Sequence, residues 1–288
     1  MTLGIARNPY AANVPTRLAE AAAELDIPIR VIDLPTLTVD IGCNGGAAVR
    51  DAAGIVDVTS LAPYLLSGYP AAVHAFRILS WRAYTQNPVD SVLTADDKAA
   101  TAVRLSHAAL PQVPSTLCPL DLERALSVAG EIQYPVVIKR THGAQGRWVR
   151  RADNATALAQ AFHEIKSEES GALVLQPEVG EFYGRSIRAV ITGGHVLAAT
   201  LRTAAGNEWR SNIAYGATQH PVTLAPNERE LAENAARALG LGHAGIDILR
   251  TARGPLILEV NSCPDFTSML PYFDEDLTRA VLLSCLPP

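Results

Sequence analysis

The chain has 288 residues and a formal net charge of −5, and it is 48% hydrophobic but only 18% charged. This composition is typical of a well-packed enzyme and excludes a disordered protein. The acidic balance provides no overall basic field, so we expect no nucleic-acid partner.

Membrane and secretory features are not predicted. No apolar run approaches the roughly 20 residues that a bilayer span needs, and the N-terminus lacks a basic start followed by an apolar stretch. The four cysteines form no CxxC pair, which favours reduced thiols over a zinc site. We therefore expect a cytoplasmic protein without a membrane partner.

The first third of the chain predicts a small α/β unit. Residues 11–25 and 70–83 have the composition of helices, whereas 29–32 and 55–58 are β-branched and predict strands. Residues 42–46 predict a loop. They lack the strand–GxGxxG–helix context of a dinucleotide site, so none is predicted there.

A new segment is predicted to begin near residue 94. Thr94 or Asp96 can cap a helix that continues to about residue 109, where Pro111 and Pro114 end it. From residue 134 onward, short β-branched strands separated by glycine turns are expected. The last part adds a helix at 228–239 and strands at 244–250 and 256–260.

The two last strands carry the most informative pattern. With residues 251–255 as their turn, antiparallel pairing sets Asp247 opposite Glu259, and alternation places Glu259 and Asn261 on one face and Leu258 and Val260 on the other. Opposed carboxylates repel each other unless a cation lies between them. Mg²⁺ favours carboxylate and amide oxygens, so Asp247, Glu259 and Asn261 are candidate ligands. A solvated polar face is the alternative interpretation.

A buried strand at 135–139 ends in Lys139 and leads into a loop with Gly143 and Gly146. A P-loop has the opposite order, with its lysine after the glycines and a helix behind it. We expect a β-hairpin lid instead, with residues 147–150 as its return strand. Its backbone N–H groups can approach phosphates while Lys139 neutralises their charge. An ordinary turn is the alternative.

Three arginines, Arg188, Arg202 and Arg210, are predicted near the ends of a β-meander. Guanidinium groups suit carboxylates, phosphates and the oxyanion of a tetrahedral intermediate. Surface ion pairs are the alternative, and these usually contribute little.

Together and in this order, these residues resemble the ATP-grasp superfamily, and within it the RimK-like amino-acid (α-L-glutamate) ligases. The resemblance runs from about residue 97 to 264. Its most specific parts are the 135–139 strand with the 143–146 loop, 209–212, 244–249 and 258–264. It implies an N-terminal α/β subdomain (1–95) and an α+β ATP-grasp fold, with a central (96–174) and a C-terminal (175–288) subdomain clamping ATP.

The resemblance also implies residue roles. Lys98 and Lys139 match the phosphate-binding lysines, and Gly143 and Gly146 the lid. Arg188 and Arg202 match positions near the acyl phosphate. The remaining matches are the adenine hinge of Gln176, Pro177, Glu178 and Val179, the phosphate- and metal-side strand with Arg210 and Asn212, and the metal ligands Asp247, Glu259 and Asn261.

The chain also departs from the family pattern. Pro177 cannot donate a backbone hydrogen bond in the hinge, and Ser186 stands where an aspartate near the nucleotide is common. Ala214 and Tyr215 replace more usual basic residues. These changes bear on the identity of the acceptor more than on the ligase assignment.

The resemblance implies ATP and Mg²⁺ as cofactors, with Mn²⁺ as the alternative metal. The expected activity joins an amino acid, glutamate first, to a small-molecule, cofactor or carrier carboxylate through an acyl phosphate. A homo-oligomer is typical of such ligases. Two other classes stay open: an ATP-binding regulatory or scaffold protein without transfer, and a phosphotransferase on the same scaffold.

Overall fold

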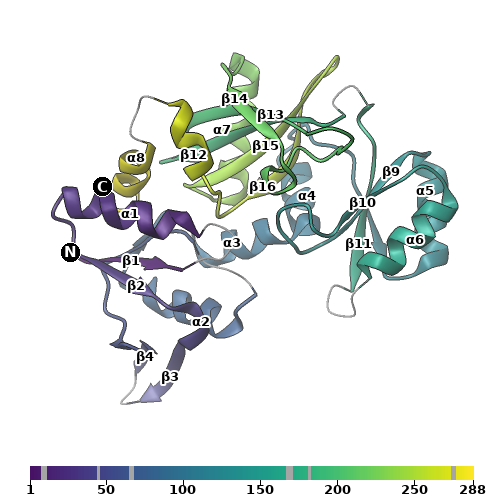
Figure 1. The fold of residues 1–288 in the computed structure, drawn as a ribbon. Helices are drawn as coiled ribbons and strands as arrows, with labels where there is room; N and C mark the ends of the chain where they lie inside the picture. Colours follow the sequence, from purple (N-terminus) through teal and green to yellow (C-terminus); the bar gives the residue numbers. More distant parts are fainter. Residues whose placement is uncertain (8–11, 44–45, 65–67, 167–170, 181–182, 274–276) are drawn as a thin grey trace.

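The protein is described by a computed structural model of residues 1–288, except for 8–11, 44–45, 65–67, 167–170, 181–182 and 274–276. The described strands form four sheets (Figure 1). Two antiparallel sheets face each other from the central and C-terminal parts of the chain, and a parallel sheet lies in the N-terminal part.

The N-terminal part contains a four-stranded parallel sheet in the order β2-β1-β6-β7. A separate antiparallel ribbon is formed by β3, β4 and β5. The elements are β1 (Leu3–Ala6), α1 (Asn13–Glu24), β2 (Ile29–Ile32), β3 (Thr38–Cys43), β4 (Gly46–Asp51), β5 (Gly54–Ile55), β6 (Ser60–Leu61), α2 (Pro70–Leu79) and β7 (Tyr84–Thr85).

The strand predicted at 55–58 is wrong in position. Val56 and Val58 are buried in the core under α2 but belong to no strand. On the side away from β2, the parallel partner of β1 is β6, where Ser60 pairs with Leu3. The side chains of the two valines fill the hydrophobic core. The backbone hydrogen bonds to β1 are made two residues after Val58, at Ser60. The loop predicted at 42–46 is also replaced, at its described positions, by the ends of β3 and β4.

The single helix predicted after residue 94 is two helices, α3 (Val89–Asp96) and α4 (Lys98–His107). The N-cap is Asp97 and neither Thr94 nor Asp96, which end α3. Asp97 Oδ1 accepts from the backbone nitrogens of Ala99 at 2.8 Å and Ala100 at 3.4 Å. This cap satisfies two free N–H groups and fixes the start of α4, so Lys98 is its first residue.

The central part is an antiparallel sheet in the order β10-β9-β11-β8, with α5 and α6 packed against it (Figure 1). The return strand of the glycine loop begins at Val149, because Arg147 and Trp148 belong to the turn. The elements are β8 (Thr116–Pro119), α5 (Leu122–Ile132), β9 (Val136–Arg140), β10 (Val149–Ala152), α6 (Ala155–Ile165) and β11 (Ala172–Pro177).

The C-terminal part is a five-stranded antiparallel sheet in the order β14-β13-β12-β15-β16, and α7 packs on one face. Helix α8 packs on α1 from the other end of the chain, so the two termini share a core (Figure 1). The elements are β12 (Arg185–Thr192), β13 (His195–Thr203), β14 (Thr218–Pro221), α7 (Pro226–Leu239), β15 (Ala244–Thr251), β16 (Gly254–Asn261) and α8 (Leu277–Ser284).

The β15–β16 hairpin confirms that Asp247 pairs with Glu259, but by a different route from the one predicted. The turn is tighter, because Thr251 pairs with Gly254. That register alone would shift the carboxylates by one position, and a bulge between Asp247 and Ile248 restores their pairing. Leu258 is the extra residue. It lines the cleft beside Glu259 instead of joining the core, so the alternation predicted for it is wrong.

Candidate active site

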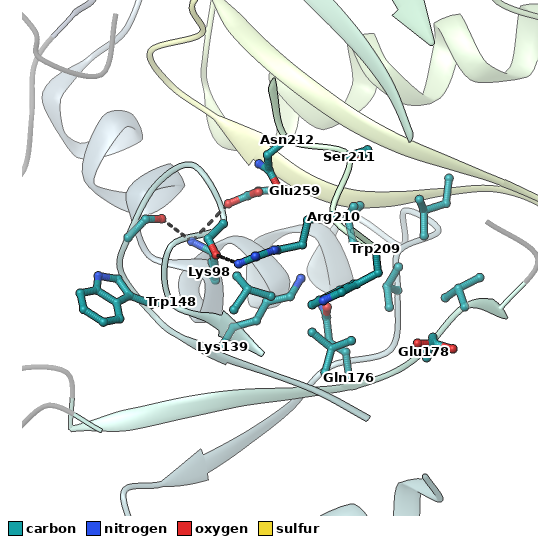
Figure 2. A pocket seen from close by; sticks show the side chains of 18 of the residues that line it. Lys98, Lys139, Trp148, Gln176, Glu178, Trp209, Arg210, Ser211, Asn212 and Glu259 are labelled. Carbon is teal, nitrogen blue, oxygen red and sulfur yellow. Dashed lines mark hydrogen bonds and ion pairs between the residues drawn. The ribbon is translucent and has the colours of Figure 1, made fainter. Parts of the chain in front are cut away.

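A cleft of about 940 Å³, including its open mouth, lies between the two facing antiparallel sheets (Figure 2). It brings together all but one of the residues predicted to bind nucleotide. Those on its wall are Lys98, Lys139, Gly143, Gly146, Gln176, Pro177, Glu178, Val179, Arg210 and Asn212. The exception, Ser186, lies on β12, and its Oγ is 2.6 Å from the Oγ of Ser211.

Two lysines contribute positive charge to the cleft. Lys139, at the end of β9, is 7% exposed, and burial lowers its pKa to about 8, partly opposed by Glu259. Lys98 Nζ donates to the carbonyl of Gly143 at 2.7 Å and lies 3.2 Å from Glu259 Oε1 (Figure 2). Lys98 therefore connects the glycine loop to the carboxylate on the opposite sheet.

The glycine loop needs its glycines for two reasons. Gly143 and Gly146 have φ of +133° and +71°, which L side chains rarely adopt. A Cβ at Gly146 would lie 2.8 Å from Asn212 Oδ1, and one at Gly143 would lie 2.8 Å from Trp148 Cδ1. The loop therefore lies in close contact with the 208–212 segment, and Arg210 Nη1 donates to the Gly146 carbonyl at 3.1 Å.

Residues 208–212 were expected on a strand but form a loop between β13 and β14. Glu208 orients Arg210 with a two-point ion pair, at 2.9 Å to Nε and 2.8 Å to Nη2. Hydrogen bonds from Arg210 hold the pKa of Glu208 at about 2. The Arg210 guanidinium also stacks 3.6 Å from the centre of the Tyr215 ring. Because residues 208–212 form no strand, Arg210 is held by side-chain contacts with Glu208 and Tyr215 and not by backbone pairing.

The hinge at the end of β11 has few free donors. The Gln176 side chain donates to Ser115 Oγ at 2.8 Å, and the backbone nitrogen of Glu178 donates to the Pro135 carbonyl at 3.1 Å. Pro177 has no N–H. The backbone N–H of Val179 follows these three positions and is the next donor along the hinge.

A second pocket adjoins the cleft and shares Asn212 and Glu259 with it. Its wall also contains Arg188, Arg202 and Asn261. Asp247 lies behind this wall, where Arg188 forms a two-point ion pair with it at 2.6 and 2.7 Å. Burial opposes ionisation of Asp247, but Arg188 keeps its pKa below the usual value.

Arg202 differs from the other two arginines. It is 6% exposed, and its Nε has no hydrogen-bond partner among the described residues. Burial, reinforced by Arg188, lowers its pKa to about 9. A buried guanidinium without a partner is costly, so this side chain is suited to an anionic ligand in the second pocket.

The predicted metal ligands fit a magnesium ion in part. Glu259 and Asn261 face the second pocket with oxygen donors, beside the lysines that would hold phosphate. Asp247 pairs across the hairpin with Glu259 but is engaged by Arg188. Within the described ranges, no group of three or more His, Cys, Asp or Glu side chains is arranged to hold a metal. The donor set therefore leaves coordination positions for water and phosphate oxygens.

Sequence reasoning missed Asp265, Trp148 and Glu208. Asp265 lines the second pocket, Trp148 lies under the Arg140 guanidinium at 3.7 Å, and Glu208 holds Arg210. The position of Asp265, four residues after Asn261 in the same segment, was a usable signal. Cys263 packs against the N-terminal part of the chain: its Sγ donates to the Pro63 carbonyl at 3.3 Å, and burial raises the pKa of its thiol.

The family described as "RimK-like ATP-grasp domain" matches residues 95–283, about two thirds of the chain. The chain belongs to the RimK-like ATP-grasp family. A relative from Xanthomonas campestris, named "Probable alpha-L-glutamate ligase", is 32% identical over 255 residues, 86% of each chain. A relative of the same name from Parasynechococcus marenigrum is 40% identical over 164 residues, 57% of this chain and 34% of that protein.

The solved structures agree on the fold. The ATP-grasp ligase PsnB, solved with a phosphomimetic variant of its minimal precursor, Mg and ADP, aligns with a TM-score of 0.71. It is 15% identical, and the alignment covers 98% of this chain and 97% of that one. As an ATP-grasp family member, this protein is a ligase that forms a C–N bond between a carboxylate and an amine, using ATP and Mg²⁺. None of the helices formed by the described residues is long and apolar enough to cross a membrane.

Proposed function

We propose that this RimK-like ligase adds an amino acid, with glutamate as the first candidate, to the carboxylate of a small molecule, cofactor or carrier. The observation that carries the proposal is the junction of the two pockets at Asn212 and Glu259. It sets the end of the cleft that carries Lys98 and Glu259 beside a second pocket with two arginines. The names of the two relatives support glutamate as the amine substrate.

In this proposal the cleft binds ATP with its adenine at residues 176–179 and its phosphates at Lys98 and Lys139. The loop with Gly143 and Gly146 covers the phosphates and excludes water, which would otherwise hydrolyse an acyl phosphate. Arg210 lies against this loop through the Gly146 carbonyl. Ser186, through Ser211, supports the segment that carries Arg210.

Glu259 and Asn261 would hold the metal, with Asp247 opposite Glu259 on β15. Mg²⁺ supplies Lewis-acid stabilisation of phosphate charge at this position, and Mn²⁺ accepts the same oxygen donors. Arg188 neutralises Asp247. We therefore assign the direct contacts to Glu259 and Asn261, and to Asp247 once Arg188 turns toward substrate.

The proposed reaction proceeds through an acyl phosphate, and the three arginines stabilise the charge that develops along it. A substrate carboxylate oxygen attacks the γ-phosphorus and ADP leaves, giving an acyl phosphate. An amine nitrogen then attacks the carbonyl carbon, the bond to phosphate breaks, and an amide remains. Arg188, Arg202 and Arg210 stabilise the negative charge that develops on the carbonyl and phosphate oxygens. We also propose that the protein is cytoplasmic and forms a homo-oligomer.

The first test is ADP release from Mg-ATP against a panel of amino acids, with and without a small-molecule extract of the source cells. We expect release only when both are present, and a product heavier than the carboxylate by one amino acid less water. Bound ATP without ADP release in any mixture would contradict the proposal and favour a regulatory protein. A stable phosphorylated product without an amide would favour a phosphotransferase.

The metal assignment has its own test, the double variant Asp247→Asn with Glu259→Gln. Both changes keep the side-chain size while removing the anionic oxygens, so ADP formation should be abolished in a folded protein. Folding is checked by circular dichroism. Near-normal turnover in the double variant would contradict the assignment.

A further inference from the structure

The second pocket contains a carboxylate that none of the assigned roles uses. Asp265 is half-buried on its wall, between Asn261 and the short helix that begins at Thr267. Its Oδ1 accepts from the Thr267 backbone nitrogen at 2.9 Å and from Thr267 Oγ1 at 2.6 Å. These two bonds fix the carboxylate in one orientation through a single oxygen.

Asp265 takes part in no ion pair among the described residues, although Arg188 and Arg202 line the same pocket. Arg188 is committed to Asp247, and Arg202 has a buried, unpartnered Nε. The pocket therefore presents a guanidinium and a carboxylate that, among the described residues, form no ion pair with each other. An α-amino acid carries the complementary pair of charges, one carboxylate and one ammonium.

We propose that Asp265 binds the ammonium group of the amine substrate, positions it toward the acyl phosphate and receives its first proton. This inference rests on the proposed function. The ammonium transfers one proton to the Asp265 carboxylate, and the freed lone pair forms the N–C bond. The C–O bond to phosphate then breaks, and its electron pair leaves with phosphate, which takes the second proton from nitrogen.

The charged and titratable groups around Asp265 come from every side of the pocket. Arg188 is on β12, Arg202 on β13 and Glu259 on β16, while Cys263 precedes Asp265 in the same segment. Tyr64, from the N-terminal part, also lies near Asp265: burial raises the pKa of Tyr64, and the charge of Asp265 adds to that rise. Arg202, whose Nε has no partner among the described residues, can bind the carboxylate of the same amino acid.

The decisive variant is Asp265→Asn, which keeps the oxygen that accepts from Thr267 and removes the charge. In steady-state assays of amide formation, kcat/KM for the amino acid should fall about 10²- to 10⁴-fold, the usual range for a lost proton acceptor. The KM for ATP should stay within twofold. The variant's rate should also rise with pH from 7 to 9 more steeply than the wild type's, because free amine becomes abundant.

Hydroxylamine separates this role from a structural one. It is largely neutral at pH 7 and traps acyl phosphates without needing an ammonium site. Asp265→Asn should therefore form hydroxamate at close to the wild-type rate while failing with the amino acid. Asp90→Asn, a charge loss at an exposed residue of α3, is the matched control and should leave both reactions unchanged.

The outcomes are separable. An equal loss with hydroxylamine and the amino acid, or an unchanged kcat/KM for the amino acid, would overturn the role of Asp265 and leave the proposed function intact. Wild-type protein that never needs an amino acid for ADP release would overturn the proposed function, and the Asp265 assignment with it. Asp265→Glu should recover part of the lost rate, since the charge returns on a longer side chain.

Discussion

Gly245 is the residue that gives Arg188 its space. A Cβ at this position would lie 3.1 Å from Arg188 Nη1 and 2.9 Å from the Pro264 Cβ. The guanidinium can lie across β15 and reach Asp247 only because residue 245 has no side chain. The arrangement of the second pocket therefore depends on the absence of a side chain at residue 245.

We expect Gly245→Ala to displace Arg188 and lower the rate of ADP release at least tenfold. Crowding of this kind also costs about 1–3 kcal/mol of folding free energy. Steady-state kinetics and urea unfolding measure the two effects. Wild-type kinetics in the variant would show that Arg188 does not need its present position.

Lys139 predicts a pH dependence of nucleotide binding. Its pKa is lowered to about 8 by burial, and phosphates would favour the charged form. Affinity for ATP should therefore be greatest below pH 8 and fall as the pH rises through that value, with proton uptake on binding near pH 8. Calorimetry in two buffers of different ionisation enthalpy measures the uptake. Lys139→Arg should abolish it, and buffer-independent heats for the wild type at pH 8 would contradict the prediction.

At the scale of single elements, the glycine loop and helix α5 offer a matched pair of substitutions. Gly146 has positive φ and faces Asn212, whereas Gly130 lies inside α5, where an added Cβ meets nothing within 4 Å. The same chemical change should therefore have opposite effects at the two sites.

Gly146→Ala should raise the KM for ATP about tenfold or more, because it strains the loop and pushes Asn212 away. Gly130→Ala should leave catalysis unchanged and stabilise the protein by about 0.5–1 kcal/mol through helix propensity. ATP kinetics and thermal melting of both variants check this. Equal ATP kinetics in the two would mean that the loop does not cover the phosphates.

The β15–β16 hairpin contains a bulge that could not be predicted from its sequence. Opposed carboxylates were expected from a register counted back from a five-residue turn. The turn is three residues shorter and a bulge at Leu258 compensates, so Asp247 still pairs with Glu259. A single sequence carries no strong mark of a bulge, since Leu258 fits either face of a strand.

At the scale of the whole molecule, Asn87 ties the N-terminal part to the C-terminal sheet. Its Nδ2 donates to the carbonyls of His243 at 2.7 Å and Ser262 at 3.1 Å, and its Oδ1 accepts from the His243 nitrogen at 2.9 Å. All of these groups are buried. The segment that follows Asn261 is therefore held from the N-terminal part of the chain.

Asn87→Ala would remove the side-chain partner of three buried backbone groups and should lower the free energy of unfolding by about 3 kcal/mol or more, given about 1–3 kcal/mol for each unsatisfied group. Urea denaturation measures it. Asn234→Ala, on the solvent side of α7, removes only a bond to Arg237 and should stay within about 0.5 kcal/mol. Equal stabilities of the two variants would show that Asn87 does not couple the two parts.

The sequence by itself determined the family and most of the residues that line the cleft. The strand with Lys139, the glycines and the Asp247–Glu259–Asn261 spacing are local patterns, and local patterns can be read from one sequence. Local alternation and turn chemistry specify such features over a few residues. The subdomain ranges 1–95, 96–174 and 175–288 stay predictions of the same kind. Only the tertiary structure decided that Arg188 engages Asp247, that the Arg202 Nε finds no partner in the described part of the chain, and that Asp265 shares their pocket. These relations join β12, β13, β15 and the segment after β16, and side-chain contacts between distant strands depend on packing that no local pattern encodes.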